Sequence, residues 1–310
     1  MAILFSTSYN VTSIVLDIKV YRMVCRESRK KKMKKIFLTL LLFSSIFAQA
    51  NRILTLPPTA QVSSVGNVFL PFMNPARYPL KKDMFGFSRV NWMDNLTDDM
   101  FYTHLSLKRQ QFNFSMLAFN YGSQLETNDN GVVLGDFTPT SSVWSFGWGG
   151  KVKNYNIGAR AKIISHDLYS QKTLGTAFDV ATYLPKVYKD LDIDVQLSNF
   201  GFAPTFNDYK TMLPTSLNVG MTYPYKQWMF YEQYNIFKKF YTWGSGVSYN
   251  YNNALWGKAG YYSDKKHNLR YGTFGVSMKY DKYLLNMSYI YGKEDNPLSN
   301  TIRLTINLEI

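Results

Sequence analysis

Hydrophobic and polar residues alternate along most of the chain after residue 84, in segments of about ten residues. The last segment is the clearest, because Ile302, Leu304 and Ile306 fall on one side of an extended strand, opposite Arg303 and Thr305. Successive side chains of a strand point to opposite faces, so a period of two indicates strands with one apolar face. Beyond residue 50 no apolar run approaches the roughly 18 residues of a transmembrane helix.

The alternation predicts fourteen strands. Their expected ranges are 84–92, 100–108, 112–120, 141–150, 155–165, 175–184, 190–199, 214–223, 227–236, 241–251, 254–262, 270–280, 283–292 and 300–310. An even number of alternating segments of this length is typical of bacterial transmembrane barrels, in which only alternate residues meet lipid. The sequence therefore predicts an all-β fold, a transmembrane antiparallel β-barrel of about 14 strands.

The lengths of the links between these segments support a barrel. Every second link is short, at 109–111, 151–154, 185–189, 224–226, 252–253 and 281–282. The other links are mostly longer, notably 121–140 and 200–213, although 237–240 is shorter than this scheme requires. Short periplasmic turns and longer extracellular loops are typical of outer-membrane barrels. This spacing places both ends of the barrel on the periplasmic side, where the first and last strands can pair.

Aromatic residues flank the short links, as expected for a girdle at the lipid headgroups. They are Trp148, Tyr155, Tyr223, Trp228, Tyr249, Tyr251, Tyr280 and Tyr283. Charged residues fall on the opposite, lumen-facing side of most strands, and the candidates are Arg160, Lys162, Asp179, Asp192, Asp194, Lys258, Lys279, Arg303 and Glu309. Glu232 is the exception, because it shares the apolar side of its strand with Phe230 and Tyr234; a bulge or a strand end outside the membrane is the only explanation the sequence offers.

The first 50 residues predict export. Residues 33–50 contain a basic start, an apolar run over 36–47 and an Ala-Gln-Ala cleavage site, so cleavage is expected after Ala50. Twelve apolar residues span about 18 Å as a helix, less than the roughly 30 Å of a bilayer core. Residues 1–32 precede this complete signal peptide and are interpreted as the product of an upstream start codon; a long genuine n-region is the alternative.

Charge and cysteine content narrow the function classes. Half of the formal net charge of +14 lies in residues 1–50, which weakens the case for a nucleic-acid-binding protein. The one cysteine, Cys25, also lies in the leader, so the mature part is expected to hold no disulfide and no cysteine metal site. A soluble extracellular β-sandwich or adhesin remains an alternative, but it does not require an aromatic girdle or alternating link lengths.

Few residues suggest catalysis or metal binding. His104 and Ser106 share the lumen side of one strand, but two positions along a strand separate their side chains by about 7 Å, too far for a direct hydrogen bond. His166 and His267 are expected in surface loops. Asp192 and Asp194 share one face and could bind a cation, although salt bridges to Arg160 or Lys162 are the preferred interpretation. No phosphate-binding, nucleophile-elbow or dinucleotide motif occurs in the mature sequence, so we expect neither an enzyme nor a cofactor.

A segment without alternation precedes the first strand. It holds a run of small residues from Ala60 to Phe69, followed by Asn74-Pro75-Ala76. It resembles the N-terminal hatch of FadL-type barrels and, in particular, the PorV/PorQ branch. Further short motifs occur in the order that this group shows, at 158–163, 177–183, 199–201, 214–220 and 260–262. The glycine-rich stretch before N-P-A is reduced here to Gly66, and the chain ends on Ile310 where many such barrels end on Phe.

The resemblance implies a hatch over 51–83 that plugs the lumen of a barrel formed by 84–310, with hatch residues Gly66, Asn67, Asn74, Pro75 and Ala76. It implies a non-enzymatic outer-membrane protein that acts in type IX-like protein secretion and surface attachment. The alternative is a FadL-like channel for long-chain fatty acids or other hydrophobic small molecules. The expected partners are outer-membrane lipid, the barrel-insertion machinery (through Ile310), and secretion subunits or cargo, or else a hydrophobic ligand.

Overall fold

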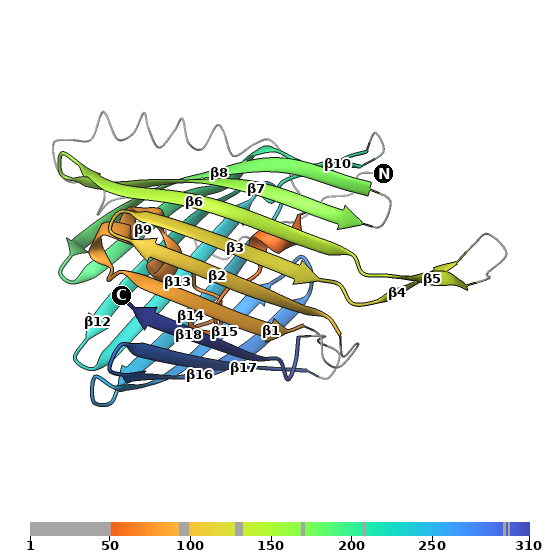
Figure 1. The fold of residues 1–310 in the computed structure, drawn as a ribbon. Coiled ribbons are helices and arrows are strands. Elements are labelled where there is room, and N and C mark those ends of the chain that lie inside the picture. The colour runs from red at the N-terminus through yellow and green to blue at the C-terminus, as the bar shows by residue number, and fades with distance from the viewer. Residues whose placement is uncertain are drawn as a thin grey trace, which may run out of the picture. The chain divides into compact units, whose positions relative to one another are not determined.

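The computed structural model describes residues 51–92, 99–127, 133–168, 171–206, 209–293, 296 and 298–310 (Figure 1). The expected signal peptide and the residues before it lie outside the described residues. No helix in the described part of the chain has the length and apolar character needed to cross a membrane.

Fourteen strands form one closed antiparallel barrel (Figure 1). They are β1 (Met84–Asn91), β2 (Phe101–Arg109), β3 (Phe112–Asn120), β6 (Thr140–Val152), β7 (Tyr155–Leu168), β8 (Gln171–Tyr188), β9 (Leu191–Phe202), β12 (Ser216–Tyr225), β13 (Trp228–Phe237), β14 (Tyr241–Asn250), β15 (Leu255–Asp264), β16 (Leu269–Tyr280), β17 (Tyr283–Gly292) and β18 (Ile302–Glu309). Each strand pairs with its neighbour in sequence, and β1 pairs with β18 to close the ring. All fourteen predicted strands are confirmed.

Two short hairpins lie in the long links. β4 (Gln124–Thr127) pairs with β5 (Val133–Phe137), and β10 (Thr205–Phe206) pairs with β11 (Tyr209–Lys210). The β4–β5 hairpin projects beyond the barrel at the end that carries the longer links (Figure 1). We call this end the loop end. The opposite end, where short turns such as 110–111, 153–154 and 226–227 connect the strands, is the turn end.

The outer face of the barrel is apolar. On β18 the side chains of Ile302, Leu304 and Ile306 are about half exposed, whereas Arg303 and Thr305 are buried on the inner face. Apolar residues alternate with buried polar ones in the same way on most strands. An apolar exterior around a closed barrel is the surface expected of a protein whose strands cross a bilayer.

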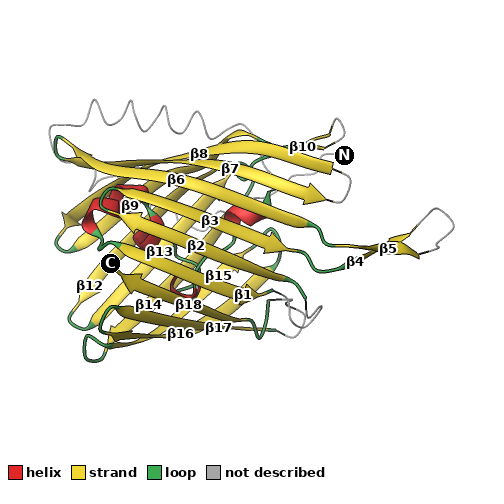
Figure 2. Ribbon diagram, viewed as in Figure 1, coloured by secondary structure: helices red, strands yellow, loops and turns green. Residues whose placement is uncertain are grey.

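The segment from residue 51 to 80, here called the internal segment, lies inside the ring of strands (Figure 2). It contains four short helical turns, η1 (Arg52–Thr55), α3 (Ala60–Ser63), α4 (Leu70–Met73) and η2 (Pro75–Leu80). Polar caps and prolines define these turns: the Thr59 hydroxyl accepts from Val62 N, and the Asn74 carboxamide accepts from Ala76 N. The prolines of the segment keep it from forming one long helix.

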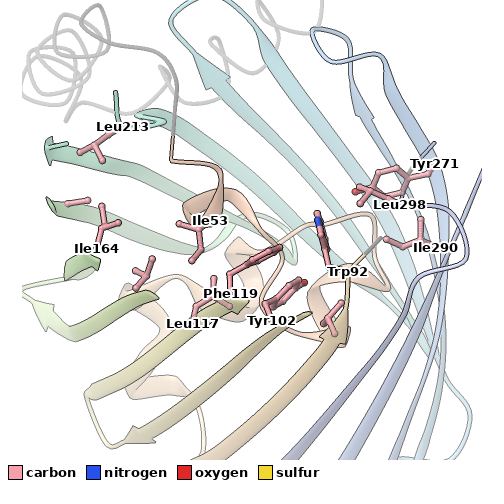
Figure 3. Packing of buried hydrophobic residues seen from close by; sticks show 13 residues of the cluster. Ile53, Trp92, Tyr102, Leu117, Phe119, Ile164, Leu213, Tyr271, Ile290 and Leu298 are labelled. Carbon is pink, nitrogen blue, oxygen red and sulfur yellow. The ribbon is translucent and has the colours of Figure 1, made fainter. Parts of the chain in front are cut away.

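Apolar side chains gather inside the barrel towards the loop end (Figure 3). The cluster contains Ile53, Val90, Trp92, Tyr102, Leu117, Phe119, Val143, Ile164, Ala177, Leu213, Tyr271, Ile290 and Leu298. Ile53 comes from the internal segment, and the others come mainly from the inner faces of strands. Transmembrane barrels normally have polar interiors, so this apolar lining calls for a functional explanation.

Candidate functional site

Inward-facing polar residues of the wall hold the backbone of the internal segment. The Gln233 side-chain oxygen accepts from Phe69 N at 2.8 Å and from Leu70 N at 2.9 Å. On β18, five strands further around the barrel, the Thr305 hydroxyl accepts from Ala60 N at 2.8 Å. Such bonds satisfy backbone N–H groups that the short helical turns leave without partners.

An ion pair fixes the N-P-A end of the internal segment. Arg77 Nε donates to Asp194 Oδ1 at 2.8 Å, and Arg77 Nη2 lies 2.7 Å from Asp194 Oδ2. Asn74 Nδ2 donates to the same Asp194 Oδ1 at 2.7 Å, and the Arg77 guanidinium lies 3.9 Å from the centre of the Tyr183 ring. We call Asn74, Arg77, Tyr183 and Asp194 the clasp. Two parallel bonds from one guanidinium to a fully buried carboxylate make a strong and directional contact.

Asp179 is the centre of a second buried network. Lys162 Nζ donates to Asp179 Oδ1 at 2.8 Å, and Arg160 Nη1 lies 3.5 Å from Asp179 Oδ2. Arg160 also donates to the Met73 carbonyl, which links the network to the internal segment. The salt bridge expected for Asp194 is therefore present, but the expected partners, Arg160 and Lys162, are wrong. The ion-pair partner of Asp194 is Arg77. The Tyr183 hydroxyl donates to the Asp192 carboxylate at 2.8 Å.

Glycines in the wall allow the internal segment to lie directly against the strands. A Cβ atom at Gly158 would collide with the backbone of Pro75 and Ala76, and one at Gly246 would collide with Val65. Gly66 itself has a φ of +71°, and a Cβ there would meet carbonyl groups of the wall. These close contacts leave little room for solute between the segment and the wall at the turn end.

Lys81 directly follows the internal segment and lies close to other cations. Its ammonium donates to the Phe72 carbonyl. Burial lowers the pKa of Lys81 to about 7, and the nearby charges of Arg77, Arg160 and Lys108 act in the same direction, against the attraction of Asp194.

A cavity of about 150 Å³ lies inside the barrel. On one side it is bordered by the internal segment, through residues 53–58 and through Val62, Asn67, Phe69 and Met73. Its wall is mixed: Leu117, Val143, Phe237 and Tyr262 are apolar or aromatic, whereas His104, Arg160, Lys162, Gln196, Asn218 and Asn235 are polar. Part of this polar wall is the Asp179 network. The cavity can accept a small molecule that combines an apolar part with a polar group.

Arg303 lies in the apolar cluster at the loop end and is completely buried. Its Nη1 donates to the Pro57 carbonyl at 3.2 Å, and the guanidinium lies 5.7 Å from the Trp92 ring and 6.0 Å from the Tyr102 ring. Tyr102 donates to the same Pro57 carbonyl at 2.7 Å. Arg303 thus joins β18 to the internal segment, while its Nε and Nη2 make no hydrogen bond within the described structure.

The structure brings most of the predicted site residues together around the internal segment. Asn67 donates to the Tyr271 hydroxyl at 2.6 Å, and the predicted hatch residues Gly66, Asn74, Pro75 and Ala76 all contact the wall. Ile310 stands apart at the turn end, where its N–H donates to the Asp83 carbonyl at 3.2 Å. Sequence reasoning missed Arg77 and Gln233, because neither residue belongs to a recognisable motif.

His166 and Glu232 also differ from expectation. His166 lies in β7 and is buried, not in a loop, with Nδ1 2.6 Å from the Ser141 hydroxyl and Nε2 2.8 Å from Asn51 Oδ1. Strand β13 pairs on both sides without a register shift, so no bulge moves Glu232 off the lipid-facing side. Instead, the Trp243 indole N–H donates to the Glu232 carboxylate at 2.5 Å.

A closed fourteen-stranded barrel with an apolar exterior and a folded segment inside defines a transmembrane β-barrel. The chain is similar to solved structures of the toluene transporter TodX of Pseudomonas putida. One has a TM-score of 0.52 and 11% identity, and covers 81% of this chain and 98% of that one. A deltaS2 mutant of the TodX monoaromatic hydrocarbon channel has a TM-score of 0.53 and 12% identity, with coverages of 82% and 97%.

At this level of identity the similarity shows the fold alone, and it agrees with the transmembrane antiparallel β-barrel of about 14 strands expected from the sequence. No protein-family profile and no curated protein sequence matches the chain. The PorV/PorQ part of the resemblance stays a prediction.

Proposed function

We propose that the protein is a FadL-like outer-membrane channel for small hydrophobic or amphipathic molecules. The observation that carries this proposal is the distribution of apolar and polar side chains inside the barrel. The loop-end half is lined by an aromatic and aliphatic cluster, whereas the turn-end half is closed by the internal segment and its polar anchors. A pore for hydrophilic solutes needs no apolar lining and would be obstructed by such a segment.

Aromatic rings form the part of this lining that suits a hydrophobic ligand best. Trp92 lies 5.6 Å from the Tyr102 ring, and Tyr102 stacks on Phe119 at 6.0 Å. Ile53 belongs to the same apolar cluster, Leu54 and Leu56 pack against it, and all three also border the cavity. A ligand that enters from the loop end would therefore meet the aromatic group first and the mixed cavity next.

The size of the cavity limits what it can hold without movement. A volume of about 150 Å³ matches that of cavities known to bind one aromatic ring. A longer acyl chain requires residues 53–58 to move, because these residues border the cavity. The internal segment would then act both as the plug and as the element that responds to the ligand.

The first interpretation of the sequence, a PorV/PorQ-type factor in protein secretion, rests on the N-P-A element and the short motifs of the chain. In the structure Asn74 of that element belongs to the clasp inside the barrel, a role that suits a channel hatch equally well. We therefore rank the secretion role second.

Mass spectrometry of the protein extracted from its native membrane in mild detergent separates the two roles. A stoichiometric hydrophobic or amphipathic small molecule, without protein partners, is the result expected of a channel. Co-purification of secreted proteins and secretion subunits, with no small molecule, would contradict the channel and favour the secretion factor.

A further inference from the structure

Four lysines at the turn end adopt a backbone conformation that lysine rarely adopts. Lys153, Lys186, Lys189 and Lys226 have positive φ values of 49–55°. Among the described residues, seven other non-glycine residues have positive φ, and five of these are asparagine. Asparagine tolerates this region well and lysine does not. The chain thus uses the suitable residue elsewhere, but places a cation at these four positions at a conformational cost.

The four lysines, here called the lysine arc, occupy one part of the turn end. Three of them, Lys153, Lys189 and Lys226, lie in the turns that join β6 to β7, β8 to β9, and β12 to β13, and Lys186 lies at the irregular turn end of β8. These six strands are consecutive around the barrel. All four side chains are exposed. The only carboxylate exposed in these three turns is that of Asp190, 3.8 Å from Lys186 Nζ. The arc is therefore strongly positive.

The arc lies at the level where the barrel meets lipid headgroups. Tyr188 and Tyr225, both more than half exposed, directly precede Lys189 and Lys226, and each lysine Nζ lies 5.5 Å from the ring centre of that tyrosine. Trp228 and Tyr155 are exposed beside the same turns. Exposed amphipathic rings at the edge of an apolar band mark the membrane interface, where lysine side chains reach headgroup phosphates.

We propose that the lysine arc is a binding surface for the phosphate groups of anionic phospholipids in the leaflet at the turn end, which is the periplasmic leaflet of an outer membrane. The proposal concerns how the barrel is held in its membrane, and does not depend on what passes through the lumen. Cations beside an anionic lipid surface attract it additively, so four adjacent lysines select anionic over zwitterionic lipid.

Native mass spectrometry tests this with the protein in mixed micelles of phosphatidylglycerol and phosphatidylcholine. The test variant is K153N/K186N/K189N/K226N, since asparagine suits each backbone position. The matched control, K238N/K239N/K265N/K266N, removes four exposed cations from the loop end. A second variant, K189N/K226N, keeps the test informative if the fourfold variant does not fold, as judged by heat-modifiable gel migration.

The wild-type protein and the loop-end control are expected to retain phosphatidylglycerol in excess of its share of the micelle. Each lysine lost from the arc should lower that excess by up to about fivefold, and the fourfold variant should show none. The proposal is overturned if the wild-type protein retains both lipids equally, or if the arc variants and the loop-end control behave alike. In that case the arc would fit a soluble acidic partner instead.

Discussion

At the residue scale, buried polar side chains with fixed partners decide how firmly the lumen is closed. Asp194 is the clearest case, because its carboxylate is fully buried and accepts from both Arg77 and Asn74. Removal of one partner from such a pair leaves an uncompensated charge, which costs more than removal of both.

Arg77→Met is therefore expected to release the N-P-A end of the internal segment, with a loss of about 3 kcal/mol of stability. The double variant Arg77→Met/Asp194→Leu removes both charges and should recover most of that loss. Single-channel recording in planar bilayers, together with urea unfolding, measures both effects. If the single and double variants behaved alike, the clasp would not hold the segment through charge.

Glu232 is a carboxylate on the lipid-facing side of its strand, and its hydrogen bond to Trp243 gives a prediction about stability. Glu232→Gln keeps an acceptor for the Trp243 indole and removes a charge from the apolar band, so stability should stay within about 1 kcal/mol of wild type or rise. Trp243→Phe removes the donor and should destabilise the barrel by about 1–3 kcal/mol. Urea unfolding in lipid vesicles compares the two; a larger loss from Glu232→Gln would show that its charge is required.

The lowered pKa of Lys81 predicts that the stability of the folded protein depends on pH. In the folded protein its pKa is about 7, whereas an unfolded lysine keeps its proton up to about 10.5, so folding releases a proton between these values. The contribution of Lys81 to stability therefore rises with pH from about 7 to 10. Lys81→Met should flatten this rise in thermal unfolding measured at pH 7 and pH 9; an unchanged slope would assign the pH dependence to other groups.

At the element scale, the strands were predictable and the contacts of the internal segment were not. Strand β17 matches its predicted range of 283–292, because alternation needs only local sequence. Strand β7 extends beyond its prediction to Leu168, and this extension places His166 in the lumen. The clasp could not be predicted, because Arg77 and Asp194 are 117 positions apart and the internal segment has no periodicity that gives its orientation.

The packing of η2 against β7 gives a prediction at this scale. Gly158→Ala places a Cβ against the backbone of Pro75 and Ala76, so it should displace η2 and cost about 1–3 kcal/mol. The control is Gly257→Ala on β15, where no atom lies within 4 Å of the added Cβ. The loss of stability is measured as a decrease in the temperature at which the protein changes from its folded to its unfolded position on the gel. An equal decrease for both variants would mean that η2 does not depend on this contact.

At the scale of the whole molecule, a barrel of fourteen strands is too wide for its own side chains to fill. The N-P-A end of the internal segment closes the turn-end half of the lumen, and the apolar cluster, which includes Ile53 of the same segment, lines the loop-end half. This asymmetry is the basis of the proposed channel, since a hydrophobic ligand finds a favourable surface at one end and a movable barrier at the other. The sequence predicted the barrier as a resemblance, but it gave no indication of the apolar cluster.

The most direct test of this account is the conductance of the protein in planar bilayers with and without residues 51–76, with heat-modifiable migration as the check that both forms are folded barrels. The account predicts that the mature protein conducts small ions poorly and that the deletion gives a large, stable increase. A folded deletion variant with unchanged conductance would contradict it, because the lumen would then be closed by something other than the internal segment.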